Sequence, residues 1–323
     1  MPALLLLACM AWGATPALLA TSAVAQTSNS STKSVRIVAP FAPAGYPDRL
    51  GRVIAKYLSD SLGLGQRVYV ENRPGAGGII GSAEVARAPA DGTTLLISSL
   101  PSHVLAPLIN PNVGFDPVGG FSHIAYVGGP PNAIVVSAKS KLATFEDLLR
   151  AARGDSVTYG TAGIGTAGHL LAAFVANQGK LQFTHVPYNG PMIADIMTGV
   201  VDVGSITLST VASNVEGGNL RLLAVATKDR LPAFAAVPTL KEAGFDISGI
   251  GWLALSGPPR LDVDLIRRLN QDVTKMLGQP ELRDLLRQEI IEPIAMTPEG
   301  LTEFIKDEIA RWSPVVAAAG LKK

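Results

Sequence analysis

Cysteine is almost absent from this chain of 323 residues. The one cysteine, Cys9, lies in an apolar N-terminal stretch, so the rest of the chain has no disulfide, no cysteine nucleophile and no cysteine-ligated zinc. Small exported domains usually need such cross-links, but a chain of this length can bury a core without them.

An excess of charge of one sign is missing as well. The chain has 27 basic and 26 acidic residues, a balance that gives no electrostatic footprint for nucleic acid. Its four histidines, at 103, 123, 169 and 185, form no pair at metal-ligand spacing. The Gly-x-Ser-x-Gly and phosphate-loop motifs are also missing from the sequence. We therefore expect no metal, no cofactor and no catalytic centre.

A long apolar run occurs only at the N-terminus, from Leu4 to about Ala20. A small-x-small pattern ending at Ala25 follows it, which predicts a signal peptide over residues 1–25, cleaved near Ala25, and export to the periplasm. The run lacks the usual preceding positive charge, since the first basic residue is Lys33, and the true start codon stays open. A membrane anchor and lipidation of Cys9 are the alternatives; an anchor needs about 20 uninterrupted apolar residues.

Short strands alternate with helices along most of the remaining chain. We expect strands at 35–39, 67–70, 94–97, 124–128, 133–137, 157–161, 183–186, 201–206, 222–226 and 252–256. A helix after the first strand closes at Gly63, Thr144 caps another with Asp147 at its third position, and residues 101–120 read as a loop. Three amphipathic helices follow residue 263 and are expected to pack back onto an existing domain. This alternation predicts two α/β units, each with a parallel sheet covered by helices on both faces.

Three glycine-rich turns, at 40–48, 72–81 and 160–168, each follow an expected strand and precede an expected helix. Such a turn presents free backbone N–H groups and the positive end of a helix dipole, which together favour an anion. Gly163, Gly165 and Gly168 have the spacing of a dinucleotide fingerprint. That fingerprint needs an acidic residue about 20 positions later. The next acid is Asp195, so a small carboxylate is favoured over a nucleotide.

Several polar residues lie beside these turns. Ser99, Ser102, Thr161 and Thr166 stand at expected strand ends, where ligands of doubly wound sheets bind. His103 follows the third strand and is either a structural residue or a contact for an anionic ligand. Asp48 is either a helix cap or a group that shapes the pocket.

A set of motifs recurs here in a fixed order. They are Pro40 to Asp48, Glu71 to Gly78, Asp91-Gly92, Thr161 to His169, His185 to Tyr188, Gly199 with Val201 to Val203, Leu223 to Val225, and Val237 to Thr239 before Glu242 to Gly244. Together they resemble the Bug receptors, the periplasmic solute-binding receptors of tripartite tricarboxylate transporters. The resemblance extends from Val35 to Gly320.

The resemblance implies a two-domain periplasmic binding protein, a type II-like Venus flytrap with the ligand cleft between its domains. Domain 1 would comprise 34–136 and 252–323, and domain 2 would comprise 137–251, with hinges near Ser137 and Gly251. A ligand carboxylate would be held by Ala44 to Asp48 and Thr161 to Thr166, largely through backbone amides and water. The receptor would act as a monomer, without a cofactor, and deliver its ligand to the membrane permease subunits.

The candidate ligand-binding residues are therefore Ala44, Gly45, Tyr46, Asp48, Ser99, Ser102, His103, Thr161, Gly163, Ile164, Gly165, Thr166 and Ser205. Two departures from the family pattern are the bulky Tyr46 in the first turn and Asn189 where relatives often carry a basic residue. Tyr46 would narrow the pocket or stack on an aromatic acid, so aliphatic, tricarboxylic, amino and aromatic acids all stay open. The alternatives are an exported α/β hydrolase or isomerase of a small carboxylic acid, and a sensory rather than a transport receptor.

Overall fold

The computed structural model of this chain describes residues 34–43, 45–61, 67–188, 190, 192–249, 251–291 and 293–322. The expected signal peptide with Cys9, the turn residue Ala44, the helix end at Gly63, and Asn189 all lie outside the described residues. Among the helices in these ranges, none combines the length and apolar character that a membrane crossing requires.

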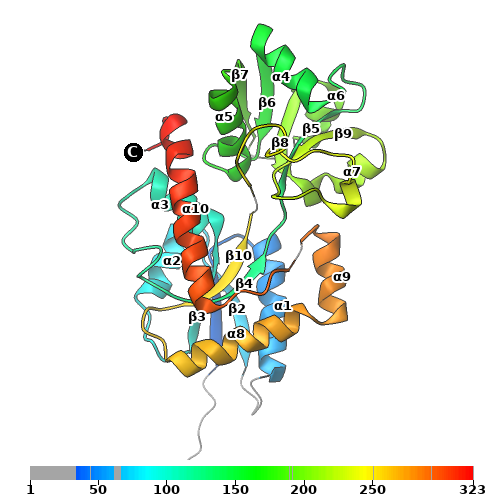
Figure 1. Ribbon diagram of the computed structural model, residues 1–323. Helices are drawn as coiled ribbons and strands as arrows, with labels where there is room; N and C mark the ends of the chain where they lie inside the picture. The colour runs from blue at the N-terminus through cyan, green and yellow to red at the C-terminus, as the bar shows by residue number, and fades with distance from the viewer. Residues whose placement is uncertain are drawn as a thin grey trace, which may run out of the picture. The chain divides into compact units, whose positions relative to one another are not determined.

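The first sheet has five strands in the order β2-β1-β3-β10-β4 (Figure 1). They are β1 (Val35–Ala39), β2 (Val68–Asn72), β3 (Thr94–Ser99), β4 (Ser122–Gly128) and β10 (Leu253–Gly257). Strand β1 runs parallel to both of its neighbours, whereas β10 runs antiparallel to β3 and β4.

The second sheet has the order β7-β6-β8-β5-β9 and follows the same plan. Its strands are β5 (Asn132–Ser137), β6 (Val157–Thr161), β7 (Phe183–Pro187), β8 (Val203–Thr207) and β9 (Leu220–Val225). Strand β6 is parallel to β7 and β8, and β5 is antiparallel to β8 and β9. The α/β class is therefore confirmed, but the expectation of purely parallel sheets is wrong. In each sheet the antiparallel strand is the one that arrives from the other sheet.

The chain crosses between the sheets twice, and the two crossovers lie side by side. The backbone N–H of Gly251 donates to the Pro130 carbonyl at 3.0 Å, and that of Asn132 donates to the Gly249 carbonyl at 2.8 Å. A Cβ placed on Gly129 would lie only 2.1 Å from the carbonyl oxygen of Gly251, so this contact requires glycine. Strand β5, which follows the first crossover, pairs with β8 and β9 of the second sheet.

Within the described ranges, ten α-helices surround the sheets. They are α1 (Tyr46–Ser61), α2 (Ile79–Ala86), α3 (Ala106–Ile109), α4 (Phe145–Gly154), α5 (Ala167–Gly179), α6 (Ile193–Thr198), α7 (Ala212–Glu216), α8 (Val263–Leu277), α9 (Pro280–Gln288) and α10 (Pro298–Ala318), with shorter helical turns η1 (Ala76–Gly78), η2 (Pro101–Leu105), η3 (Leu208–Thr210) and η4 (Pro232–Phe234). The expected cap of α4 is confirmed: the backbone N–H of Asp147 donates to the Thr144 hydroxyl at 3.1 Å, and the Asp147 carboxylate accepts from the Thr144 N–H.

The segment expected to be a loop from residue 101 begins instead with the π-helical turn η2 and continues into α3. The hydroxyl of Ser99 accepts from the backbone N–H of Ser102 at 3.2 Å, which holds the start of this turn. Val104 and Leu105 are then buried in the core, so tertiary packing overrides a sequence rich in proline and asparagine.

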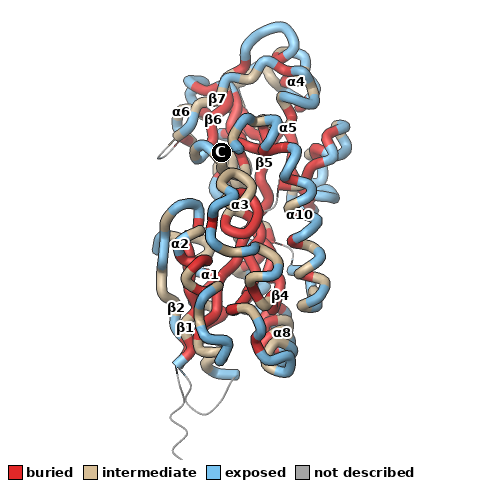
Figure 2. Tube along the Cα trace, turned by 90° about the vertical axis from the view of Figure 1, so that its left-hand side faces the viewer, coloured by how far each residue is buried: buried red, intermediate tan, exposed pale blue. Residues whose placement is uncertain are grey.

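Of the three C-terminal helices, α8 and α10 pack on the first sheet and α9 packs on α8. Helix α8 packs on β4 and α1, whereas α10 packs on β4, on η2 and on α5 of the second sheet. The indole N–H groups of Trp252 and Trp312 both donate to the buried Glu308 of α10, at 3.2 and 3.4 Å. Burial is deepest along the central strands, and exposure is concentrated in the loops and on the outer faces of helices (Figure 2).

Candidate functional site

Two adjoining cavities, of roughly 510 and 270 Å³, open beside the third glycine turn. The larger one is lined by Gly77, Pro101, Asn132, Ala162, Ile164 to Gly168, Gly190, Met192, Ile193, Ser205 to Thr207, Thr210 and Gly251. Gly77, Pro101, Ile164 and Gly165 also line the smaller cavity. Residues associated with both sheets therefore face one space, as a cleft between two domains requires.

The turn between β6 and α5 is shaped by its own side chains. Gly163 and Gly165 have φ angles of +125° and +78°, which favour glycine. The hydroxyls of Thr161 and Thr166 both donate to the Gly163 carbonyl, at 3.2 and 2.8 Å. We expected these hydroxyls to face the ligand, but the structure uses them to hold the turn.

Helix α5 begins at the wall of the larger cavity. Thr166 caps it by accepting from the backbone N–H of His169. The first N–H groups of a helix have no partner within the helix, so those of Ala167 and Gly168, both of which line the cavity, are available to an anion.

Gly168 brings this helix end against β8. A Cβ on Gly168 would lie 2.3 Å from the carbonyl oxygen of Ser205. The Ser205 hydroxyl in turn donates to the Gly168 carbonyl at 2.7 Å. Ser205 therefore lines the cavity, and its hydroxyl is engaged in fixing the start of α5.

Two histidines support the same turn from behind. His169 Nδ1 accepts from the backbone N–H of Gly165 at 3.1 Å, and His185 Nε2 lies 2.7 Å from the Thr161 hydroxyl. Burial and the neighbouring His185 lower the pKa of His169 to about 4. Neither histidine is marked as a site residue by the sequence, because only the fold brings β7 beside α5.

The first glycine turn contributes less than expected in the described residues. Tyr46, the first residue of α1, packs against the core of the first sheet and donates its hydroxyl to the Gly128 carbonyl at 3.4 Å, and burial raises its pKa. Asp48 accepts from the side chains of Asn72 and Arg52, both at 2.9 Å, and is 3% exposed. Neither residue lines the two cavities; Asp48 ties α1 to the end of β2.

The structure does not bring Ser99, Ser102 or His103 to the cavities, and all three are fully buried. The two serine hydroxyls lie 2.9 Å apart, and that of Ser102 lies 3.0 Å from His103 Nδ1. The His103 ring packs on Phe121 with a centroid distance of 4.6 Å. The π-helical turn η2 explains this placement, because the residues of this turn that line the smaller cavity are Pro101 and Leu105.

Charge is missing from the lining of both cavities, as far as the described residues go. A bound anion would therefore be held by backbone dipoles and not by a basic side chain. In the same ranges, no cluster of three or more His, Asp, Glu or Cys side chains is placed to hold a metal ion.

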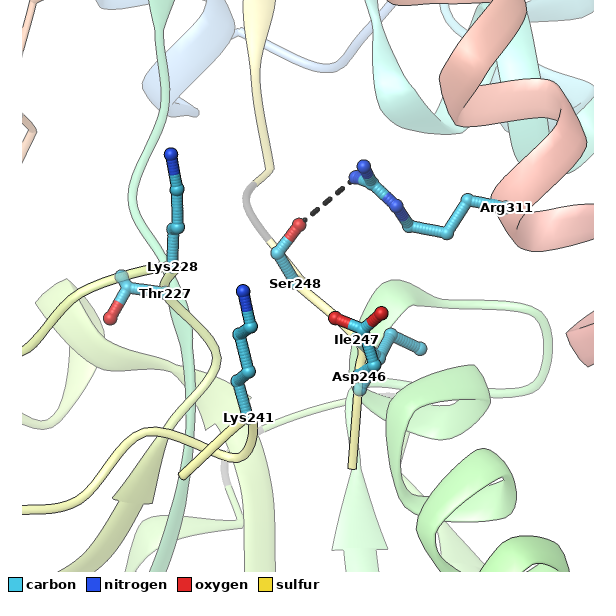
Figure 3. Close-up of a pocket in the computed structure, with 7 residues that line it drawn as sticks. All are labelled: Thr227, Lys228, Lys241, Asp246, Ile247, Ser248 and Arg311. Carbon is cyan, nitrogen blue, oxygen red and sulfur yellow. Dashed lines mark hydrogen bonds between the residues drawn. The ribbon is translucent and has the colours of Figure 1, made fainter. Parts of the chain in front are cut away.

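A different pocket, of about 230 Å³, lies where the return crossover meets α10 (Figure 3). The return crossover is the segment between β9 and β10, which leads from the second sheet back to the first. It is lined by Lys228, Lys241, Asp246 and Arg311, and Arg311 Nη1 donates to the Ser248 hydroxyl at 3.1 Å. The lysines and Asp246 are solvent-exposed, so their fields are screened. This pocket shares no lining residue with the cleft.

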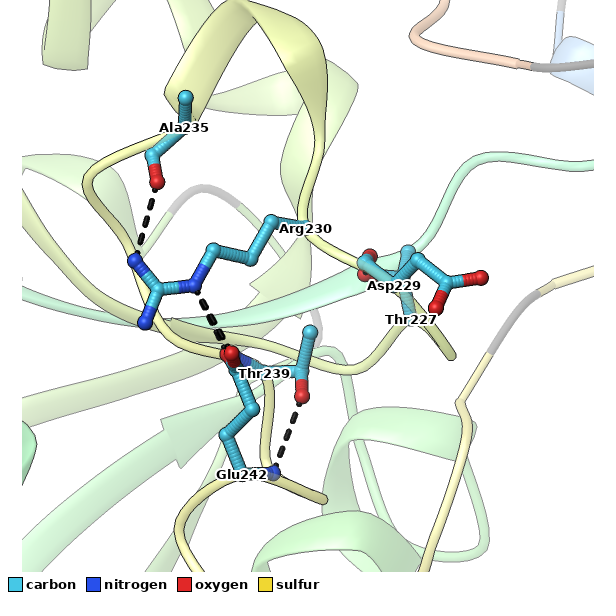
Figure 4. Close-up of polar contacts among 6 residues, drawn as sticks. All are labelled: Thr227, Asp229, Arg230, Ala235, Thr239 and Glu242. Carbon is cyan, nitrogen blue, oxygen red and sulfur yellow. Dashed lines mark hydrogen bonds and ion pairs between the residues drawn. The ribbon is translucent and has the colours of Figure 1, made fainter.

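The return crossover is braced by a polar network (Figure 4). Arg230 Nε donates to both carboxylate oxygens of Glu242, at 3.0 and 2.9 Å, and its Nη1 donates to the Ala235 carbonyl. Glu242 also accepts from the backbone N–H of Thr239 at 2.8 Å. This network gives a structural role to the motif from Val237 to Gly244.

Comparisons with known proteins agree with this geometry. The family model for the tripartite tricarboxylate transporter family receptor matches residues 50–321. The protein BugT of Bordetella pertussis is 32% identical over 296 residues, covering 90% of this chain and 90% of BugT.

Two solved structures are similar over nearly the whole chain. R. palustris Rpa4515 with adipate has a TM-score of 0.77 and 31% identity, covering 90% of this chain and 98% of that one. MatC from Rhodopseudomonas palustris with bound malate has a TM-score of 0.72 and 25% identity, covering 88% and 98%. These likenesses confirm the expected two-domain fold.

Proposed function

Because this chain belongs to the tripartite tricarboxylate transporter receptor family, we propose that it captures a small organic carboxylate at the glycine turn before α5. Receptors of this family are periplasmic solute-binding proteins that work with a membrane permease. The chain is accordingly a receptor and not an enzyme, and nothing supports the alternative of an exported hydrolase or isomerase. Cleavage near Ala25 and a monomeric receptor with one ligand are part of this proposal.

The observation that carries the ligand site is the start of α5. Its first N–H groups line an uncharged cavity, and Gly163 and Gly165 bend the preceding backbone around the same space. A carboxylate is the natural occupant, since it accepts several N–H bonds and gains from the helix dipole. Rpa4515 binds adipate and MatC binds malate, and both of these ligands are small dicarboxylates.

We propose that residues 34–128 with 252–322 form one jaw and residues 132–249 the other. Closure would bend the paired crossovers around Gly129 and Gly251, a hinge motion of a few backbone positions. Ile109 of the first jaw and Gly165 of the second support the proposed closure, because they already lie close together: a Cβ on Gly165 would lie 3.1 Å from Ile109 Cδ1. The two jaws meet at the anion-binding turn itself.

A thermal-shift screen of the mature protein tests the function. Adipate, malate, citrate, an amino acid and benzoate cover the open ligand classes. A ligand at 100 times its Kd should stabilise the protein by about 2.7 kcal/mol, which is visible as a rise in Tm. A series in which no carboxylate raises Tm would refute the carboxylate receptor.

Gly165→Val tests the site. Valine is strained at a φ of +78° and would meet Ile109, so we expect the ligand-induced shift to vanish while the ligand-free protein stays folded. Gly154→Val is the matched control, because a Cβ on Gly154 meets open space. Retained binding by Gly165→Val would rule out this placement of the anion.

A further inference from the structure

Two histidines contact the anion-binding turn at its two ends. His169 Nδ1 accepts from Gly165, and His185 Nε2 lies beside the Thr161 hydroxyl. The two imidazole rings stack, with centroids 4.0 Å apart and planes inclined by 15°. The stacked pair therefore contacts the turn at both ends and supports it.

The bond from Gly165 fixes the protonation state of His169. A backbone N–H can only donate, so Nδ1 must accept, which requires a neutral ring with its proton on Nε2. A protonated imidazole donates from both nitrogens and would set two donors against each other at 3.1 Å. The observed conformation at Gly165 is therefore compatible only with neutral His169.

The surroundings of His169 do not offset a positive charge. The residue is 8% exposed, and the titratable rings beside its imidazole are His185 of β7 and Tyr159 of β6, the latter at a centroid distance of 6.5 Å. On β8, Ser205 is neutral and bonded to Gly168. Within the described ranges, no hydrogen bond or ion pair joins either imidazole to a carboxylate. Burial lowers the pKa of His185 as well.

We propose that His169 is a positioning residue for ligand binding, that only its neutral form holds the turn, and that the stacked His185 supports it. This inference rests on the proposed carboxylate site. Its consequence is a receptor that loses affinity as the periplasm becomes acidic, through the protein and not only through protonation of the ligand.

The direction follows from linkage. Burial and the neighbouring His185 lower the pKa of His169 from the ordinary 6.5 to about 4 in the folded protein, so the neutral ring that accepts from Gly165 is favoured at neutral pH. Its advantage is fully present above pH 6.5 and is lost as the pH falls towards 4.

Two variants distinguish the effect of the hydrogen-bond acceptor of His169 from the effect of its aromatic ring. His169→Asn keeps an acceptor near the position of Nδ1 and removes the titration. His169→Phe keeps a stacking ring and removes the acceptor. With adipate as the probe at pH 7.5, we expect His169→Asn to bind within about threefold of wild type and His169→Phe about tenfold or more weakly.

The pH series is the decisive measurement, by calorimetry from pH 7.5 to 4.5. The ratio of wild-type to His169→Asn affinity cancels protonation of adipate, and it should fall by more than about twofold as the pH falls to 4.5. Near-ultraviolet circular dichroism confirms that each sample is folded. A ratio constant within about twofold across the series, or equal binding by His169→Phe and wild type, would overturn the proposal.

A measurement without ligand tests the role of His169 separately from the proposed function. Hydrogen exchange of the Gly165 amide should be slow in wild type and His169→Asn and at least about tenfold faster in His169→Phe. Unchanged exchange in His169→Phe refutes the positioning role whatever binds. If the exchange behaves as expected but wild type binds no carboxylate, the proposed function fails and the role of His169 in shaping the turn stands.

Discussion

At the scale of single residues, several polar side chains serve the backbone of the binding turn. Thr161, Thr166 and Ser205 all point their hydroxyls at carbonyl groups of the turn or of the first helical residues. A hydroxyl already engaged in this way fixes the directions of the remaining N–H groups, which is what an amide-based anion site needs.

His103, in contrast, is a buried histidine that lines neither of the two cavities. Its Nε2 has no hydrogen-bond partner in the described structure, and the ring lies among Phe115, Phe121 and His123. Burial, with His123, holds the pKa of His103 well below its usual range. The neutral ring is therefore favoured in the folded state, and acid removes that stability between pH 6.5 and the lowered pKa.

We predict that His103→Phe keeps Tm within a few degrees of wild type at pH 7.5 and loses less Tm than wild type as the pH falls from 6.5 to 4. Phenylalanine suits the aromatic cluster and removes an unpaired polar atom, while Ser102 keeps its bond to Ser99. Thermal unfolding at each pH measures both effects. An acid sensitivity identical to that of wild type would show that His103 does not titrate on unfolding.

At the scale of elements, α4 shows what local sequence can specify. Thr144 and Asp147 form a reciprocal capping box, and the hydrogen bond from Thr144 is the main reason for the lowered pKa of Asp147. Both partners lie within four residues, so no other element is needed to bring them together. Residues 101–109 show the contrary, because η2 depends on Ser99 at the end of β3 and on burial against other elements.

We predict that Thr144→Ala lowers the free energy of unfolding by about 1 kcal/mol, since it removes the acceptor for an otherwise unpaired N–H group. Chemical denaturation measures this loss. Thr144→Ser keeps the hydroxyl and should cost only a fraction of it. Ligand affinity should be unchanged in both variants, because the cap does not line the cleft.

At the scale of the whole molecule, the two crossovers decide how the jaws are joined. They touch at Gly129 and Gly251, and hydrogen bonds from Gly251 and Asn132 hold them together. Each crossover delivers the antiparallel strand of the receiving sheet, so bending there leaves both sheets intact. The α10 helix also contacts elements of both sheets and must adapt to any such motion.

We predict that Gly129→Ala separates the crossovers and weakens or abolishes the ligand-induced rise in Tm, because its Cβ would lie 2.1 Å from a backbone oxygen. Gly154→Ala is the control, since its Cβ would meet open space away from the cleft. Small-angle scattering with and without adipate reports closure directly. Wild-type closure in Gly129→Ala would contradict this hinge.

The sequence by itself determined the alternation of strands and helices, the glycine turns and the cap of α4. These depend on periodicity, on left-handed backbone angles and on partners a few residues apart. The family resemblance followed from motifs spread over the same elements. Antiparallel pairing of β5 and β10 was decided only by the tertiary structure, because it depends on where each crossover enters a sheet.

Tertiary structure also decided which side chains reach the cavity. Ser99, Ser102 and His103 stand near a strand end as expected, yet the turn η2 directs them into the core. His185 comes from a different strand and meets Thr161 and His169 only through parallel pairing of β6 with β7. A side chain's role at this site depends on long-range partners, and spacing along the chain does not specify them.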